Sequence, residues 1–163
     1  MALTVKRKRV DVDLILDQDT AERITQLGRD LTAVEQRHVT EGVNSEAKRI
    51  AGEIDELRAS VAQDTIHLTL EALPLSQWRQ VLEENTSVVD GQPKQRVEDI
   101  TRDAIRLMTV KTVPDTPVND IADIIGELSD GQISPIWYAI RDLNTRIADP
   151  KAALENASRI LHA

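Results

Sequence analysis

The chain has 163 residues, with 20 Lys+Arg against 28 Asp+Glu for a formal net charge of −8, and it contains no Cys and no Phe. The lack of cysteine excludes a disulfide framework, a thiolate nucleophile and any Cys-based zinc or iron–sulfur site. Aromatic residues make up only 2% of the chain, so a core has to be built from Leu, Ile, Val and Ala. This composition favours a helical interaction protein over an enzyme.

A basic run, Lys6–Arg9, precedes the first structured segment, and the rest of the chain holds 16 bases against 28 acids. Such a run is typical either of a nucleic-acid arm or localisation signal, or of a solvated, charged strand edge. We favour the charged edge, because no aromatic residue nearby could stack on bases and the acidic remainder would repel phosphates. No apolar stretch approaches the ~20 residues of a membrane helix, so we expect a cytoplasmic protein without membrane contact.

Two segments alternate apolar and polar residues with the period of a half-buried strand. The apolar face of residues 10–16 consists of Val10, Val12, Leu14 and Leu16, and that of residues 65–70 consists of Ile66, Leu68 and Leu70. We expect these strands to pair as an antiparallel ribbon. Two strands alone are marginal in water, so the apolar face needs cover from residues 74–163 or from another subunit.

Between the strands, apolar residues recur at spacings of three and four, which is typical of narrow coiled-coil seams. The seam residues are Ile24, Leu27, Leu31 and Val34 in a first helix, and Ala47, Ile50, Ile54, Leu57 and Val61 in a second. Asp19 and Glu22 resemble a capping box that starts the first helix, and Gly42 marks the joint. We expect an antiparallel hairpin of two helices, each of about 18–20 residues.

Seams as narrow as these pair with each other or with a partner. The candidates for self-association are therefore Ile24, Leu27, Leu31, Val34, Ile50, Ile54 and Leu57.

Residues 74–163 are predicted to form a small all-α bundle of five short helices, near 76–85, 97–110, 117–128, 135–145 and 150–161. The last three follow a cap residue and a proline, namely Thr116-Pro117, Ser134-Pro135 and Asp149-Pro150, a pattern that favours helix starts. Asp90-Gly91 indicates a polar loop. The predicted fold class is α+β, mostly α: a two-stranded antiparallel ribbon bracketing a long helical hairpin within residues 1–73, followed by this bundle.

No motif indicates catalysis. The six glycines form no phosphate- or dinucleotide-binding pattern, and there is no nucleophile elbow. The three histidines, His38, His67 and His162, lack metal-ligand spacing. For the carboxylate pairs Asp11/Asp13 and Asp120/Asp123 we favour a solvated acidic face over a weak cation site. We therefore expect no catalytic residue, metal or cofactor.

The three aromatic residues begin two predicted helices. Trp78 follows the second strand, and Trp137-Tyr138 opens a later helix. Large amphipathic rings are favoured at interfaces, but without Phe they are also needed to fill the core, the interpretation we favour. Adjacent helix residues point about 100° apart, so we expect one of the Trp137-Tyr138 pair in the core and the other near a contact surface. The candidate partner-binding residues are Trp78, Ile136, Trp137 and Tyr138.

The order of these motifs resembles that of the tail assembly chaperones of long-tailed bacteriophages, especially those infecting actinobacteria. The most specific piece is the segment Asp64-Thr-Ile-His-Leu-Thr-Leu-Glu-Ala-Leu-Pro-Leu-Ser-Gln-Trp78-Arg-Gln-Val-Leu82, a strand leading into a helix start. The second is Leu128-Ser-Asp-Gly-Gln-Ile-Ser-Pro-Ile-Trp137. The likeness covers roughly residues 10–146.

The resemblance implies a non-enzymatic protein that binds the long tape-measure protein and keeps it soluble while the tail tube assembles. It also implies action in the cytoplasm of the infected host cell, absence from the mature virion, and association with itself or with a longer frameshifted product. Two alternatives stay open. One is a structural tail or head–tail connector protein of the virion, and the other is a small nucleic-acid-binding regulator that uses Lys6–Arg9.

Overall fold

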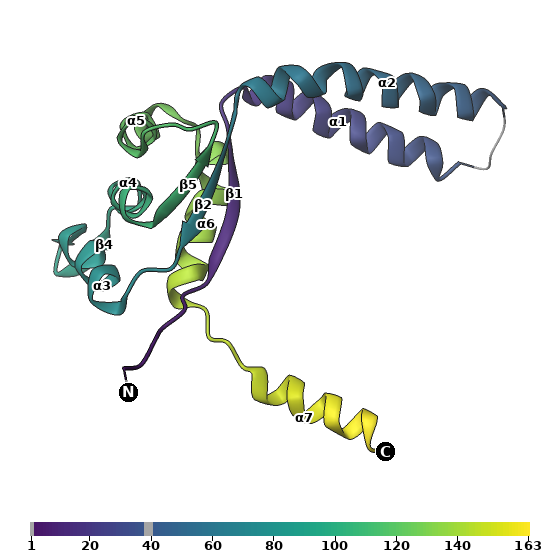
Figure 1. Cartoon of the computed structure of the whole chain (residues 1–163). Coiled ribbons are helices and arrows are strands. Elements are labelled where there is room, and N and C mark those ends of the chain that lie inside the picture. Colours follow the sequence, from purple (N-terminus) through teal and green to yellow (C-terminus); the bar gives the residue numbers. More distant parts are fainter. Residues whose placement is uncertain (1, 38–40) are drawn as a thin grey trace.

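The computed structural model describes residues 2–37 and 41–163 (Figure 1). Its fold is α+β and mostly helical, which confirms the predicted class. The elements in chain order are β1 Arg9–Ile15, α1 Gln18–Glu35, α2 Glu41–Gln63, β2 Thr65–Glu71, α3 Leu75–Glu84, β3 Thr86–Val89, β4 Gln92–Gln95, α4 Val97–Met108, β5 Thr109–Val113, α5 Val118–Asp123, a 3₁₀ turn Ile125–Glu127, α6 Asp130–Thr145 and α7 Pro150–Leu161.

The two predicted strands pair antiparallel within one chain, with Val12 opposite Leu68. The prediction of a two-stranded ribbon is wrong in one respect, because β5 pairs with the other edge of β2 and makes a sheet of order β1-β2-β5. The β5 sequence is rich in β-branched residues, which suit a pleated surface. The added strand extends the marginal pair to three strands.

Residues 74–163 are not all-α, since they also contain the hairpin of β3 and β4. Its turn is Asp90-Gly91, and both residues have positive φ, 53° and 77°. Positive φ at both central positions is what a tight hairpin turn requires, and Asp-Gly satisfies it. The expected polar loop is therefore a two-stranded hairpin, whose strand β4 is fully exposed.

The proline-marked helix starts have different outcomes. Asp149-Pro150 does begin α7, with Pro150 in its first turn, and α5 follows Thr116-Pro117 but ends early, at Asp123. Ser134-Pro135, however, lies inside α6. That helix begins one turn earlier because Ser129 and Gln132 form a reciprocal capping box. The Ser134 hydroxyl donates to the carbonyl of Asp130 at 2.7 Å.

One face of the sheet packs against α4 and α6, and α3 and α5 pack against α4 to complete a mainly aliphatic core, as the composition predicted. The fully buried members include Leu14, Leu68 and Leu70 from the strands, and Ile100, Ile105, Met108, Ile136 and Ile140 from the helices. The core thus combines residues from before and after residue 74. On the opposite face of the sheet, Asp11, Asp13, His67 and Lys111 are exposed.

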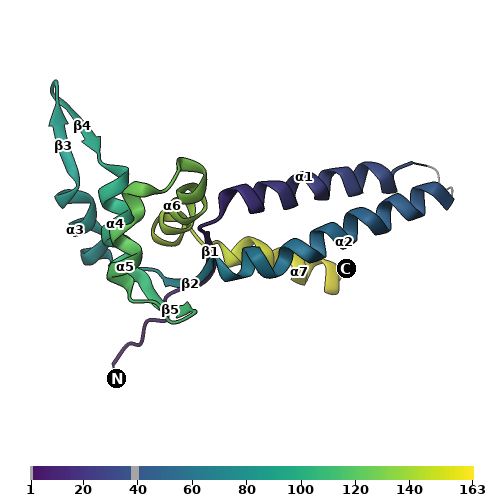
Figure 2. The same cartoon turned by 90° about the horizontal axis from the view of Figure 1, so that it is seen from above.

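The helices α1 and α2 form the expected antiparallel hairpin, which projects from one end of the body (Figures 1 and 2). It has a core of its own, in which Leu27, Val34 and Ile50 are buried. Two details of the prediction are wrong. The helix α2 begins at Glu41, so Gly42 lies inside it rather than at the joint, and the N-cap of α1 is Asp17 rather than Asp19.

Asp17 caps α1 through Thr20, whose hydroxyl and backbone N–H donate to its carboxylate at 2.5 and 3.1 Å. These bonds hold the pKa of Asp17 below its ordinary value. Replacing Asp17 with Ala removes the cap and is expected to lower the melting temperature by a few degrees. Asp17→Asn keeps an acceptor oxygen and should restore most of the loss. The matched control is Asp19→Ala, and an equal effect of that control in thermal unfolding would contradict the assignment.

Candidate partner-binding surface

The structure separates the four candidate partner-binding residues. Trp78 and Ile136 belong to the core, with 7% and 0% of their surface exposed, and Trp137 is half-buried against the same core. Tyr138 is 51% exposed. The aromatic pair on α6 is thus divided, with Trp137 packed against the core and Tyr138 facing solvent, while a contact surface at Tyr138 stays a prediction.

The exposed ring of Tyr138 lies under the guanidinium of Arg141, whose Cζ atom is 5.0 Å from the ring centre. This is within the range of a cation–π contact, and it limits the rotamers that the ring can adopt. Tyr and Arg are enriched among the residues that dominate binding energy at protein interfaces. We call Tyr138 and Arg141 the tyrosine patch.

Both ends of α6 are held by hydrogen bonds, to the sheet at its start and to the segment after β2 near its end, so the position of the tyrosine patch is fixed. At the start of α6, the Gln132 side-chain amide donates to the carbonyl of Ile15 at 2.9 Å and the hydroxyl of Ser129 donates to Gln18 at 2.9 Å. Near its end, Asn144 accepts a hydrogen bond from the backbone N–H of Leu73 at 2.8 Å. These bonds join α6 to the end of β1, to the first residue of α1 and to the segment after β2.

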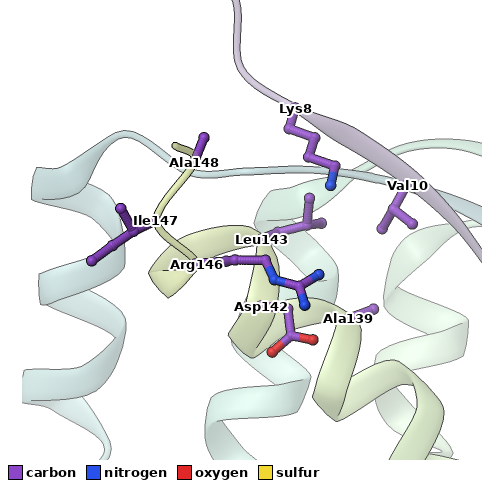
Figure 3. Close-up of a pocket in the computed structure, with 8 residues that line it drawn as sticks. All are labelled: Lys8, Val10, Ala139, Asp142, Leu143, Arg146, Ile147 and Ala148. Atoms are coloured by element: carbon purple, nitrogen blue, oxygen red, sulfur yellow. The ribbon is translucent and has the colours of Figure 1, made fainter. Parts of the chain in front are cut away.

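A groove of about 420 Å³ lies between α6, the start of β1 and the segment after α6 (Figure 3). Its lining consists of Val10, Ala139, Leu143, Ile147 and Ala148, with Lys8, Asp142 and Arg146 as charged members. A volume of this size is typical of sites that take a small ligand or a few side chains. No sequence signal indicated the groove, because it depends on the path of residues 146–148 over α6.

The self-association candidates on the hairpin lie mainly between its two helices. Leu27, Val34 and Ile50 are 2–3% exposed, and Leu31, Ile54 and Leu57 pack against them, while Ile24 is half-buried. The two seams therefore pair with each other within one chain. Self-association through these residues remains a prediction, and it would require the hairpin to open.

The basic run lies at the start of the edge strand β1 and is partly paired. Arg7 and Arg9 contact Glu71 at 3.2 and 2.7 Å, and Arg7 also donates to the carbonyl of Ala72 at 2.9 Å. This arrangement supports the interpretation as a charged strand edge. Two of the four bases that a nucleic-acid arm would offer to phosphates are already bound to a carboxylate.

The hydrogen bond from Arg9 holds the pKa of Glu71 below its ordinary value, and the charge of Arg7 acts in the same direction. Because the folded state favours the ionised form, this pair stabilises the fold at neutral pH. This contribution is complete above the pKa of Glu71 in the unfolded chain. It is lost as the pH falls from that pKa to the lower pKa of the folded state. Glu71→Gln is therefore expected to lower the melting temperature at pH 7 but to match the wild type at low pH. High salt screens the ion pair, so it should reduce the difference at pH 7.

Thermal unfolding of both proteins across acidic pH measures this difference, with the exposed Glu83→Gln as control. A gap between wild type and Glu71→Gln that stays constant down to low pH would contradict the linkage.

Asp11, Asp13 and His67 form hydrogen bonds across β1 and β2, whereas Asp120 and Asp123 lie on α5 and Asp123 contacts Arg106 at 3.7 Å. His67 Nδ1 lies 2.6 Å from Asp13, and the hydroxyl of Thr69 donates to Asp11 at 2.7 Å. Across residues 2–37 and 41–163, no group of three or more His, Cys, Asp or Glu side chains could hold a metal ion. In the same part of the chain, no helix has both the length and the apolar character to cross a bilayer. His38 lies outside the described residues.

No family model matches this chain, and no curated protein or solved structure shows significant similarity to it.

Proposed function

We propose that this protein is a tail assembly chaperone of a long-tailed bacteriophage, which binds the tape-measure protein in the cytoplasm of the infected cell and keeps it soluble while the tail tube assembles. The observation that carries the proposal is the tyrosine patch. In a chain with three aromatic residues, one ring is kept half-exposed on a helix that is tied down at both ends.

The chemistry of a tape-measure client fits such a surface. A long helical protein with apolar stripes offers grooves into which a tyrosine ring can insert, in the manner of helix recognition by apolar anchors. The net charge of −8 keeps the chaperone itself soluble. The exposed tyrosine gives contact area at a low cost in side-chain entropy.

Co-expression with the tape-measure protein tests this function. We expect the soluble fraction of the tape-measure protein to rise several-fold when this chain is present, and to fall back when the co-expressed chain carries Tyr138→Ala. Val88→Ala, which truncates an exposed side chain on β3, is the matched control. An unchanged soluble fraction with the wild-type chain would reject the proposal.

Mass spectrometry of purified particles separates the chaperone from the structural alternative. A chaperone acts before the particle is complete, so we expect its peptides to be absent from mature virions. A stoichiometric amount in the particles would instead assign the chain to the virion.

A further inference from the structure

The helix α7 has a complete apolar face that is not covered by its own chain. All its residues are exposed, and it projects away from the body (Figure 1). Leu154, Ala157 and Leu161 follow one another at spacings of three and four, with Ala153 and Ile160 beside them. The three large side chains, Leu154, Ile160 and Leu161, are 64–77% exposed. An isolated helix of 12 residues is marginal in water and gains most of its stability from packing.

The charged residues of α7 lie on its other side. Lys151, Glu155 and Arg159 repeat at a spacing of four, so they form one stripe opposite the apolar face. The apolar face can therefore be covered without taking a charge out of water, a step that would be costly. The helix and the two residues after it carry two bases and one acid, against 18 bases and 27 acids in residues 1–149. Its charge is thus opposite in sign to that of the rest of the chain.

The groove beside α6 offers an apolar surface that this face can cover. Its apolar lining comes from β1, α6 and the segment that leads to α7. Figure 3 shows Val10, Ala139 and Leu143 in the groove and Ile147 and Ala148 at its outer end, where Ile147 is 90% exposed. Because Arg146, Ile147 and Ala148 line the groove, it has this shape only while its own α7 points away. If α7 folded back in the same chain, the segment would have to reverse and these residues would leave the wall.

We propose that two copies of this chain exchange their α7 helices, with the apolar face of each α7 lying in the groove between α6 and β1 of the other copy. The exchange is reciprocal, so it closes after two chains instead of growing into a filament. It also forms the helix-in-groove contact twice, which brings the interface towards the ~1,200–2,000 Å² that stable association needs. This inference does not depend on the identity of the client.

Cysteine cross-linking tests the exchange. The chain has no cysteine of its own, so every disulfide must form between the introduced cysteines. One preparation carries Ala139→Cys in the groove, and a second, larger by a tag, carries Leu154→Cys on the apolar face of α7. After mixing and mild oxidation, we expect a covalent dimer that contains one copy of each. The matched control replaces Leu154→Cys with Ala152→Cys, on the charged side of α7, and should give several-fold less product. Equal yields from the two mixtures, or no mixed dimer, would overturn the proposal.

Light scattering after gel filtration provides the second measurement. We expect the wild-type chain to have the mass of a dimer at high concentration, Leu154→Glu to be monomeric and Ala152→Glu to stay dimeric. Leu154 is exposed within its own chain, so the circular dichroism of Leu154→Glu should show a folded protein. A wild-type monomer at every concentration would overturn the proposal, as would a dimer that survives Leu154→Glu. Cross-links that form only after the tape-measure protein is added would also overturn it and assign the groove to the client.

Discussion

Replacing Leu68 with Ala is expected to lower the free energy of unfolding by about 2–5 kcal/mol. Leu68 is fully buried at the centre of β2, the middle strand of the sheet, and its side chain packs in the core shared with the helices. The substitution removes buried apolar surface and leaves a cavity. The two flanking strands hold β2 in place, so the surrounding structure can fill that cavity only in part. Urea denaturation followed by circular dichroism measures the loss.

The neighbouring residue His67 provides the matched control for this prediction. It belongs to the same strand but points to the open face of the sheet, where it is exposed and pairs with Asp13. His67→Ala should therefore cost less than about 1 kcal/mol, since exposed pairs contribute little. Comparable losses for the two variants would mean that β2 does not present Leu68 to the core, and the strand register would be wrong.

The second large effect is expected at Tyr138 and concerns binding. If the tyrosine patch anchors the client, Tyr138→Ala should cost about 2 kcal/mol or more of binding free energy, which is a rise of roughly 30-fold in Kd. The fold should be unaffected, because half of the ring is in solvent. Calorimetry with a purified segment of the tape-measure protein measures the Kd.

Two controls keep this result interpretable. Val88→Ala truncates an exposed apolar side chain on β3 and should leave the Kd unchanged. Arg141→Lys keeps the charge but replaces the planar group over the ring, and an intermediate loss would show that ring orientation contributes. Wild-type affinity for Tyr138→Ala would remove the tyrosine patch from the interface.

The parts of the fold that were predictable from sequence are those specified by local periodicity. The alternation in residues 10–16 and 65–70 predicted β1 and β2, and the heptad seams predicted the hairpin, because each pattern extends over enough residues to identify its period. Asp149-Pro150 likewise placed the start of α7. In the strands and the helical hairpin local preference and tertiary packing agree, as they do in most of a well-folded sequence, whereas α7 rests on its local start signal alone.

The missed elements depend on tertiary contacts or on short signals. β5 follows α4 without a break, and its five residues become a strand because they can pair with β2. The hairpin of β3 and β4 carried the Asp90-Gly91 turn signal, but β3 places its two valines side by side and β4 is polar and contains Pro93, so neither strand shows the alternation that indicates a strand. Ser134-Pro135 does not begin α6, because the capping box at Ser129 starts the helix earlier and leaves Pro135 inside it.

The candidate surface was predictable only in part. Sequence spacing required Trp137 and Tyr138 to point in different directions, but only the position of α6 on the sheet determines which ring is buried. The groove and the exposure of the apolar face of α7 were missed for a related reason. Both depend on where residues 146–149 lead the chain, and no periodic pattern specifies that path.

Reconstitution from two purified components tests the proposed chaperone function most directly. The tape-measure protein is diluted from denaturant into buffer with or without a molar excess of this chain, and aggregation is followed by light scattering. We predict that the wild-type chain suppresses the scattering and that Tyr138→Ala suppresses it much less. Scattering that rises equally in the presence and absence of the folded wild-type chain would contradict the proposed function.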